Sequence, residues 1–172
     1  NFDDSESDRN REKKKESERK TRQDGYGTNG KDLKAILDED FVEGLSSSHA
    51  DERKESLTFI LRILRDSNAI VGAEDCLSAS TIDLLKKSLS RSINRLHSED
   101  QLDEAVPTMH LVCVLALLVG PDRDDFFKAF EVPLKKVIEC SSVGEVIQNL
   151  GVFALAFVSY ICSNDSLMET LT

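Results

Sequence analysis

The apolar residues between positions 102 and 162 follow a pattern that predicts packed helices. The nine apolar residues from Leu111 to Val119 cannot form a single stripe of a surface helix, so we expect this segment to be buried on all sides. A second segment of the same kind runs from Leu150 to Val158. Between them, residues 124–140 place apolar side chains on one helical face. Two buried helices bracketing an amphipathic one are typical of stacked helical hairpins.

Weaker apolar periodicity predicts three further helices, over residues 31–45, 51–68 and 80–96. The last of these is predicted to open with the capping-box-like run Ser80-Thr-Ile-Asp. A fuller capping box, Ser98-Glu-Asp-Gln, precedes the first buried segment. No segment has the pattern of a strand, and the only Asp-Gly and Asn-Gly turn pairs, Asp24-Gly25 and Asn29-Gly30, lie in the N-terminal tail.

Proline and glycine positions predict where the helices are interrupted. Gly120-Pro121 should end the first buried helix. Pro107 and Pro133 lie inside predicted helices and should kink or divide them, because proline removes a backbone donor. At Pro133 we expect a division that leaves Val132 extended or at a cap.

The spacing of the helices predicts a repeat architecture. Predicted helix starts near Asp51, Glu99 and Val143 lie 48 and 44 residues apart. This is close to the ~40–47-residue period of HEAT and armadillo repeats. The predicted fold class is therefore all-α, a HEAT/armadillo-like helical repeat solenoid. We predict that its core contains six large side chains: Leu115, Leu118, Phe130, Leu134, Leu150 and Phe153.

The first 30 residues differ in composition from the rest of the chain. Phe2 and Tyr26 are their only large apolar residues, among eight acidic and eight basic side chains. Such a segment cannot bury enough surface to offset its ordering entropy, so residues 1–30 are predicted to be a disordered charged tail. Residues 31–172 are predicted to form the armadillo-like domain. Because a new apolar pattern begins at Leu167, we expect this to be the N-terminal part of a larger protein.

Charge and cysteine usage narrow the class of protein. The tail is neutral, so the formal net charge of −10 falls on residues 31–172 and argues against a uniformly basic, nucleic-acid-binding surface. The four cysteines are widely spaced, which favours free thiols in a reducing compartment, cytoplasmic and/or nuclear. No 18-residue stretch is both uncharged and continuously apolar, so we expect no membrane span.

Candidate catalytic and metal-binding residues are few. His110 and Cys113 lie three apart on a predicted helix, but apolar surroundings favour a packed thiol over an activated nucleophile. The acidic run at 122–125 lacks the third ligand and the glycine of a calcium loop, since Phe126 and Phe127 occupy those positions. We therefore predict a protein that is not an enzyme, with no catalytic residue, cofactor, metal or small-molecule substrate.

One surface feature is a candidate for partner binding. Lys87, Arg91 and Arg95 recur every four residues on the polar side of the helix over 80–96, and Lys86 lies beside them. On an acidic protein these four cations form a local contrast that suits phosphates or an acidic partner. The alternative is that they are the solvated face of an amphipathic helix.

The order of segments resembles a known family. The run Leu111-Val-Cys-Val-Leu-Ala-Leu-Leu-Val-Gly-Pro, then Phe126-Phe-Lys-Ala-Phe and Val132-Pro-Leu-Lys-Lys-Val-Ile, with Ser163-Asn-Asp after the last helix, resembles the N-terminal region of the interferon-related developmental regulator family. The resemblance covers about residues 32–172. It implies an armadillo-like fold without enzymatic activity that regulates gene expression. The implied partners are transcriptional protein complexes or, as the alternative, the ribosome, and the acidic charge favours protein partners.

Overall fold

The computed structural model describes residues 44–66, 77–121 and 123–162. Across these ranges the chain is helical and contains no strand, which confirms the all-α prediction. The elements are α4 (Ala50–Asp66), α6 (Ala79–Asn94), η1 (Glu99–Gln101), α7 (Leu102–Val119), α8 (Asp124–Glu139), η2 (Ser141–Val143) and α9 (Gly144–Cys162), where η marks a 3₁₀ turn. The predicted tail and nearly all of the predicted helix over 31–45 lie outside the described residues.

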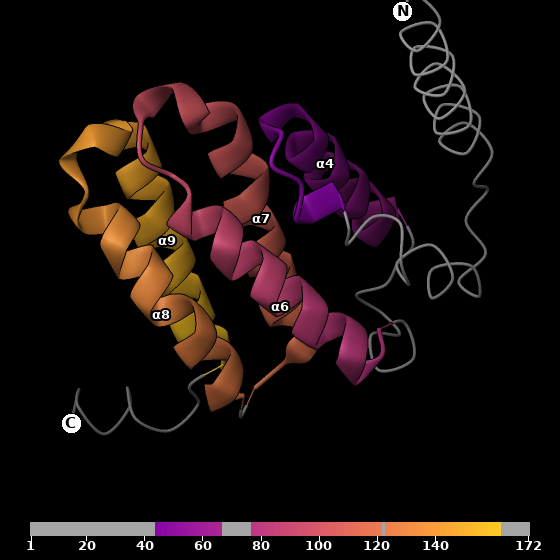
Figure 1. The fold of residues 1–172 in the computed structure, drawn as a ribbon. Coiled ribbons are helices and arrows are strands. Elements are labelled where there is room, and N and C mark those ends of the chain that lie inside the picture. Colours follow the sequence, from indigo (N-terminus) through magenta and orange to yellow (C-terminus); the bar gives the residue numbers. More distant parts are fainter. Residues whose placement is uncertain (1–43, 67–76, 122, 163–172) are drawn as a thin grey trace, which may run out of the picture.

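The five helices form two layers (Figure 1). In one layer α7 packs between α4 and α9, and in the other α6 packs beside α8. The units α6–η1–α7 and α8–η2–α9 are built alike, each with a 3₁₀ turn before its second helix, and the two turns touch. Their first helices begin 45 residues apart, at Ala79 and Asp124. Two successive helix pairs therefore stack in the same way although their side chains do not repeat.

Helix starts agree with the sequence to within a few residues. The capping box at Ser98 is confirmed: its N–H donates to Gln101 Oε1 at 3.1 Å, and η1 leads directly into α7. The predicted start at Ser80 is two residues late. Ser78 is the N-cap of α6, because its Oγ accepts the Thr81 N–H at 3.1 Å. At the other end of α7, Gly120 adopts a φ of 77°, which suits glycine, and ends the helix as predicted.

The expectation that Pro133 divides its helix is wrong, and Pro107, which was expected to kink or divide its helix, does not divide it. Pro107 lies inside α7 and Pro133 inside α8, and each helix is continuous. In α8 the side chains of Phe130 and Leu134, on either side of Pro133, are both fully buried, so the apolar face of the helix is anchored before and after the proline. That burial outweighs a proline cost of ~3 kcal/mol. Val132 is accordingly helical and more than half exposed, rather than extended or at a cap.

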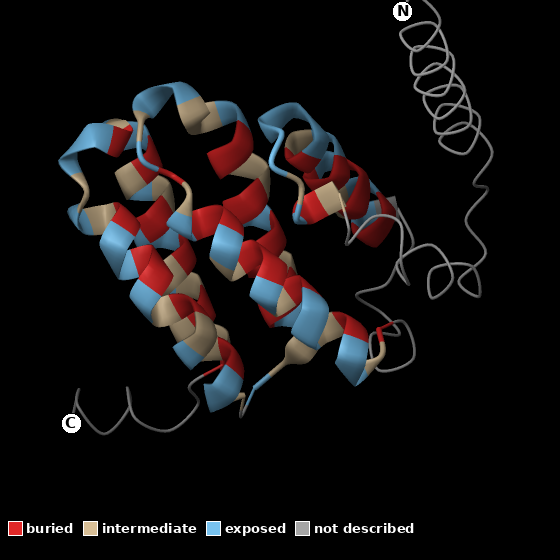
Figure 2. Ribbon diagram, viewed as in Figure 1, coloured by how far each residue is buried: buried red, intermediate tan, exposed pale blue. Residues whose placement is uncertain are grey.

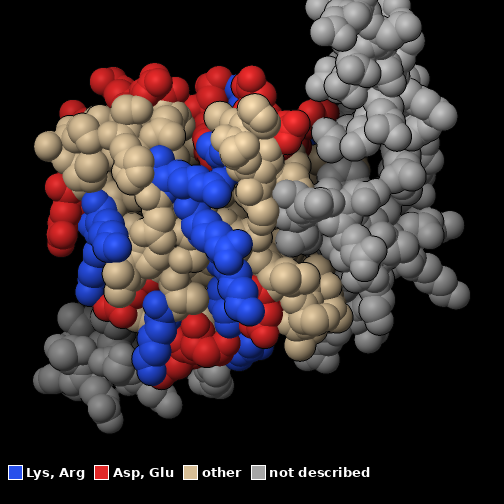
Figure 3. Space-filling view, viewed as in Figure 1, with Lys and Arg blue, Asp and Glu red and all other residues tan. Residues whose placement is uncertain are grey.

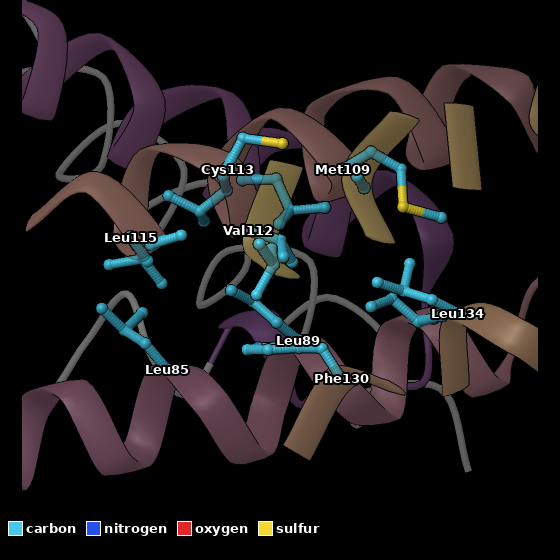
Figure 4. Packing of buried hydrophobic residues seen from close by; sticks show 14 of the residues in the cluster. Leu85, Leu89, Met109, Val112, Cys113, Leu115, Phe130 and Leu134 are labelled. Atoms are coloured by element: carbon cyan, nitrogen blue, oxygen red, sulfur yellow. The ribbon is translucent and has the colours of Figure 1, made fainter. Parts of the chain in front are cut away.

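The core lies between the two layers (Figure 4). Leu85 and Leu89 of α6 face side chains of α7, and Phe130 and Leu134 reach the same space from α8. The rings of Phe126 and Phe130 lie 4.9 Å apart at 57°, a tilted arrangement that aromatic pairs prefer. Of the six predicted core residues, Leu115, Phe130 and Leu134 are fully buried.

Two more, Leu118 and Leu150, are partly buried and pack against the core. The sixth prediction is wrong, because Phe153 is 60% exposed. The reason lies in the packing of α9. Its buried positions, including Gly151 and Ala154, face α7 and α8, and a Cβ at Gly151 would lie 3.2 Å from Ile138 Cγ1. The opposite side of α9 has no helix against it among the described residues, so the segment Leu150–Val158 is not buried on all sides. On α6 and α8, in front of it, exposed residues lie on the side turned toward the viewer (Figure 2).

Candidate partner-binding face

The predicted cations lie on the layer formed by α6 and α8. Figure 3 shows Lys and Arg gathered in two streaks on this face, with Asp and Glu concentrated at its two ends. All four residues of the predicted stripe belong to α6 or its C-cap, as expected from their spacing. The structure nevertheless separates them into three different environments.

Lys86 is a structural cation rather than a free one. Its Nζ lies 2.9 Å from Asp83 Oδ1 in α6 and 3.1 Å from Asp125 Oδ2 in α8, and only 16% of the side chain is exposed. Hydrogen bonding to Asp83, opposed by partial burial, raises the pKa of Lys86. Arg123 Nε also contacts Asp125 at 3.1 Å. Two acids and two bases thus join the first turn of α8 to α6, which removes Lys86 from the binding stripe.

Arg95 is also held in place. It is the C-cap of α6 and is half-buried, and its Nη1 donates to the Ser47 carbonyl at 3.1 Å, in the loop before α4. Binding an external anion with this group would compete with that hydrogen bond. Arg95 therefore adds positive charge to one end of the stripe, but its guanidinium is not free to bind a partner.

Lys87 and Arg91 are the two stripe residues that remain available. Both are exposed, and neither has an ion-pair partner among the described residues. On the neighbouring helix, Lys136 is exposed and likewise unpaired within the described ranges, whereas Lys135 contacts Glu131 at 2.7 Å. We call Lys87, Arg91 and Lys136 the open cations of the α6/α8 face. Sequence spacing missed Lys136, because only helix packing brings α8 beside α6.

A buried ion pair was also missed. Arg53 of α4 and Glu104 of α7 are 5% and 4% exposed and form two contacts, Nε–Oε1 at 2.7 Å and Nη2–Oε2 at 2.8 Å. Arg53 Nη1 donates to the carbonyls of Ser47 and Ser48 at 3.0 and 2.9 Å. The hydrogen bond to Glu104 raises the pKa of Arg53. No sequence signal marks this pair, because its members are 51 residues apart.

The pair considered for nucleophilic chemistry is poorly suited to it. His110 is exposed on α7, while Cys113 is buried and desolvation raises the pKa of its thiol to about 11. At neutral pH the sulfur is therefore a protonated thiol and a weak nucleophile.

The acidic run before α8 serves the helix itself. Asp122 lies outside the described residues, and Asp124 and Asp125 occupy the first turn of α8, where carboxylates complement the helix dipole. Within the described ranges no three His, Cys, Asp or Glu side chains come together as a metal-binding group.

A surface hollow of about 360 Å³ lies along α4. The described residues that line it all belong to this one helix: Asp51, Lys54, Glu55, Thr58, Phe59 and Arg62. Catalytic groups ordinarily converge on a reacting atom from several elements. This lining, which mixes two acids with two bases on a single helix, has no such convergence.

Length and composition alone would allow two stretches of the described chain to cross a membrane, Glu99–Val119 and Ser141–Cys162. The core helix of a soluble protein can be equally long and apolar. Here 50% of the most apolar 18 residues are buried in the first stretch and 28% in the second. The absence of a membrane span therefore stays a prediction.

Comparison with known proteins adds no identification. No protein-family model, no curated protein and no solved structure matches this chain.

Proposed function

We propose that this protein is a non-enzymatic helical-repeat scaffold of the HEAT/armadillo type that binds protein partners in the regulation of gene expression. The observation that carries the proposal is the α6/α8 face, where Lys87, Arg91 and Lys136 present unpaired charge on a chain of net charge −10. A local cationic patch on an acidic molecule attracts acidic partners while the rest of the surface repels them.

The repeated construction of the helix pairs supports the solenoid part of the proposal. The units α6–η1–α7 and α8–η2–α9 stack layer on layer, and α4 adds to the layer of α7 and α9. Stacked pairs of this kind create extended surfaces that suit macromolecular partners better than small molecules. The link to gene expression rests on the resemblance to the interferon-related developmental regulator family, as do the nuclear and cytoplasmic locations.

Ribosome binding is the second candidate, and the same three open cations favour it, because phosphates would engage them. The two candidates differ in salt dependence. Three phosphate contacts would lower affinity roughly 20- to 40-fold over a fourfold rise in salt, from a slope of about −0.7 to −0.9 per contact. A protein partner held by apolar contacts with charges at the rim depends much less on salt. We favour the protein partner because Asp and Glu side chains lie at both ends of the face.

The test is a pair of charge reversals. Lys87→Glu/Arg91→Glu leaves the anchored residues Lys86 and Arg95 in place, so the fold should be retained. Binding to purified ribosomes and to nuclear protein complexes is measured side by side against salt. We expect the reversal to weaken capture of a protein complex at least tenfold, with a shallow salt dependence.

The matched control is Lys54→Glu/Arg62→Glu, which changes the net charge by the same amount on α4. Equal loss in the control and the reversal would show that net charge, rather than this face, governs binding. Loss of ribosome binding alone, with a steep wild-type slope, would establish the second candidate instead.

A further inference from the structure

One side of α9 exposes large apolar side chains to solvent. Val146, Val152, Phe153 and Tyr160 are 56%, 50%, 60% and 77% exposed. Phe153 also stacks on the half-buried ring of Phe157, with centroids 5.9 Å apart. Scattered single exposed apolar residues are normal, but a contiguous set on one helix marks an interaction surface.

The exposed positions follow the spacing of a helix-packing seam. Val146, Asn149, Phe153, Ala156 and Tyr160 are all exposed and separated by three, four, three and four residues. This is the a/d spacing with which one helix packs lengthwise along another. We call these five residues the α9 seam. Its spacing suits a single helix lying along α9.

Charge distinguishes this seam from the rest of the surface. Glu145, in the first turn, is the only charged residue of α9. The outer side of α8 differs, because its exposed Val132 is surrounded along the helix by Glu131, Lys135 and Lys136. On a chain of net charge −10, the seam is a surface on which two copies could meet without opposing like charges.

We propose that the seam pairs with the α9 seam of a second copy of this chain, in antiparallel orientation about a two-fold axis. Sliding one seam against its symmetry mate gives a register in which Phe153 lies over Ala156 of the other copy. The same register places Tyr160 opposite Asn149, and symmetry makes each contact twice. Close helix packing requires this complementarity, in which a large side chain faces a small one and a polar side chain faces a polar one.

The seam is narrow, so the association is reversible rather than permanent. Stable homodimers bury about 800 Å² or more per partner, which is more than one helix face supplies. We therefore expect a monomer–dimer equilibrium in which the fraction of dimer rises over protein concentrations up to about 100 µM. A tenfold change in Kd corresponds to about 1.4 kcal/mol of binding free energy.

The test uses the full chain and a size-swap pair. Sedimentation equilibrium of the wild type should show dimer increasing with concentration. Ala156→Phe should weaken association at least tenfold, because two large rings then meet in both central layers. Phe153→Ala/Ala156→Phe restores large against small and should recover dimer. Val132→Phe on α8 is the control and should associate like the wild type. Circular dichroism checks that every variant is folded.

Three outcomes would overturn the proposal. The first is a wild type that stays monomeric at every concentration, which would mean that something else covers the seam. The second is a dimer that survives Ala156→Phe, or a double variant that stays as weak as the single one. The third is a monomer that floats with phosphatidylcholine vesicles, because the seam would then be a lipid-binding surface.

Discussion

At the scale of single residues, burial separates the three described cysteines. Desolvation raises the pKa of both Cys113 and Cys162 to about 11. Cys140 is the C-cap of α8 and is only half-buried, and the hydrogen bond between its sulfur and the Ser142 hydroxyl, at 3.1 Å, lowers its pKa. Because the thiolate is the reactive form, we expect iodoacetamide to modify Cys140 at least tenfold faster than the other two at pH 7.5.

Mass spectrometry of timed digests measures these rates. The same reaction in denaturant is the control and should make the three cysteines react alike, since burial no longer distinguishes them. Native reaction at Cys113 as fast as at Cys140 would show that α7 is not packed as described.

At the scale of elements, the Arg53–Glu104 pair holds α4 against α7. Removing one partner leaves a buried charge alone, so Arg53→Ala should lower the free energy of unfolding by ~3–5 kcal/mol. Replacing both, as Arg53→Met/Glu104→Leu, should recover most of that loss, because no buried charge then lacks a partner. Urea denaturation followed by circular dichroism measures both changes.

The neighbouring pair between the same two helices is the control. Lys54 Nζ lies 2.6 Å from Asp103 Oδ2, but these side chains are 44% and 77% exposed. Screened pairs of this kind contribute at most ~1 kcal/mol, so Lys54→Ala should have little effect. A loss as large as that of Arg53→Ala would mean that contact with α4, not burial of charge, sets the cost.

At the scale of the whole molecule, acid should weaken the junction between the helix pairs. Arg123 first, and then Lys86, hold the pKa of Asp125 down at about 2, below its usual value near 3.9. A lowered folded-state pKa stabilises the protein above about pH 5, and that contribution is lost as the pH falls toward 2. Because more than half of the Asp125 side chain is exposed, it amounts to about 0.5–1 kcal/mol.

Asp125→Asn should therefore be less stable than the wild type at pH 7, with the difference shrinking as the pH approaches 2.5. Urea midpoints at several pH values measure it. Asp124→Asn is the control, since its contact with Lys128 is longer, at 3.7 Å, and exposed. A constant difference across the pH range would show that the carboxylate charge is not the cause.

Most of the helices and much of the core were predictable from the sequence, because helix formation and burial depend on local periodicity. The capping box at Ser98, the stop at Gly120 and the buried faces of α6 and α8 all follow from residues within a few positions of each other. The cations of α6 were predictable for the same reason.

Only the tertiary structure decided which surfaces are covered and which charges are free. Phe130 lies on the single apolar face of an amphipathic helix, so its burial could be predicted, whereas α9 is apolar on several sides and only the neighbouring helices decide that Phe153 is exposed. Packing of α6 against α8 uses Lys86, leaves Lys87 open and adds Lys136 to the same face. These contacts join residues that are distant along the chain. Their energies depend on how the helices of the two layers are placed, and a short stretch of sequence does not determine that placement.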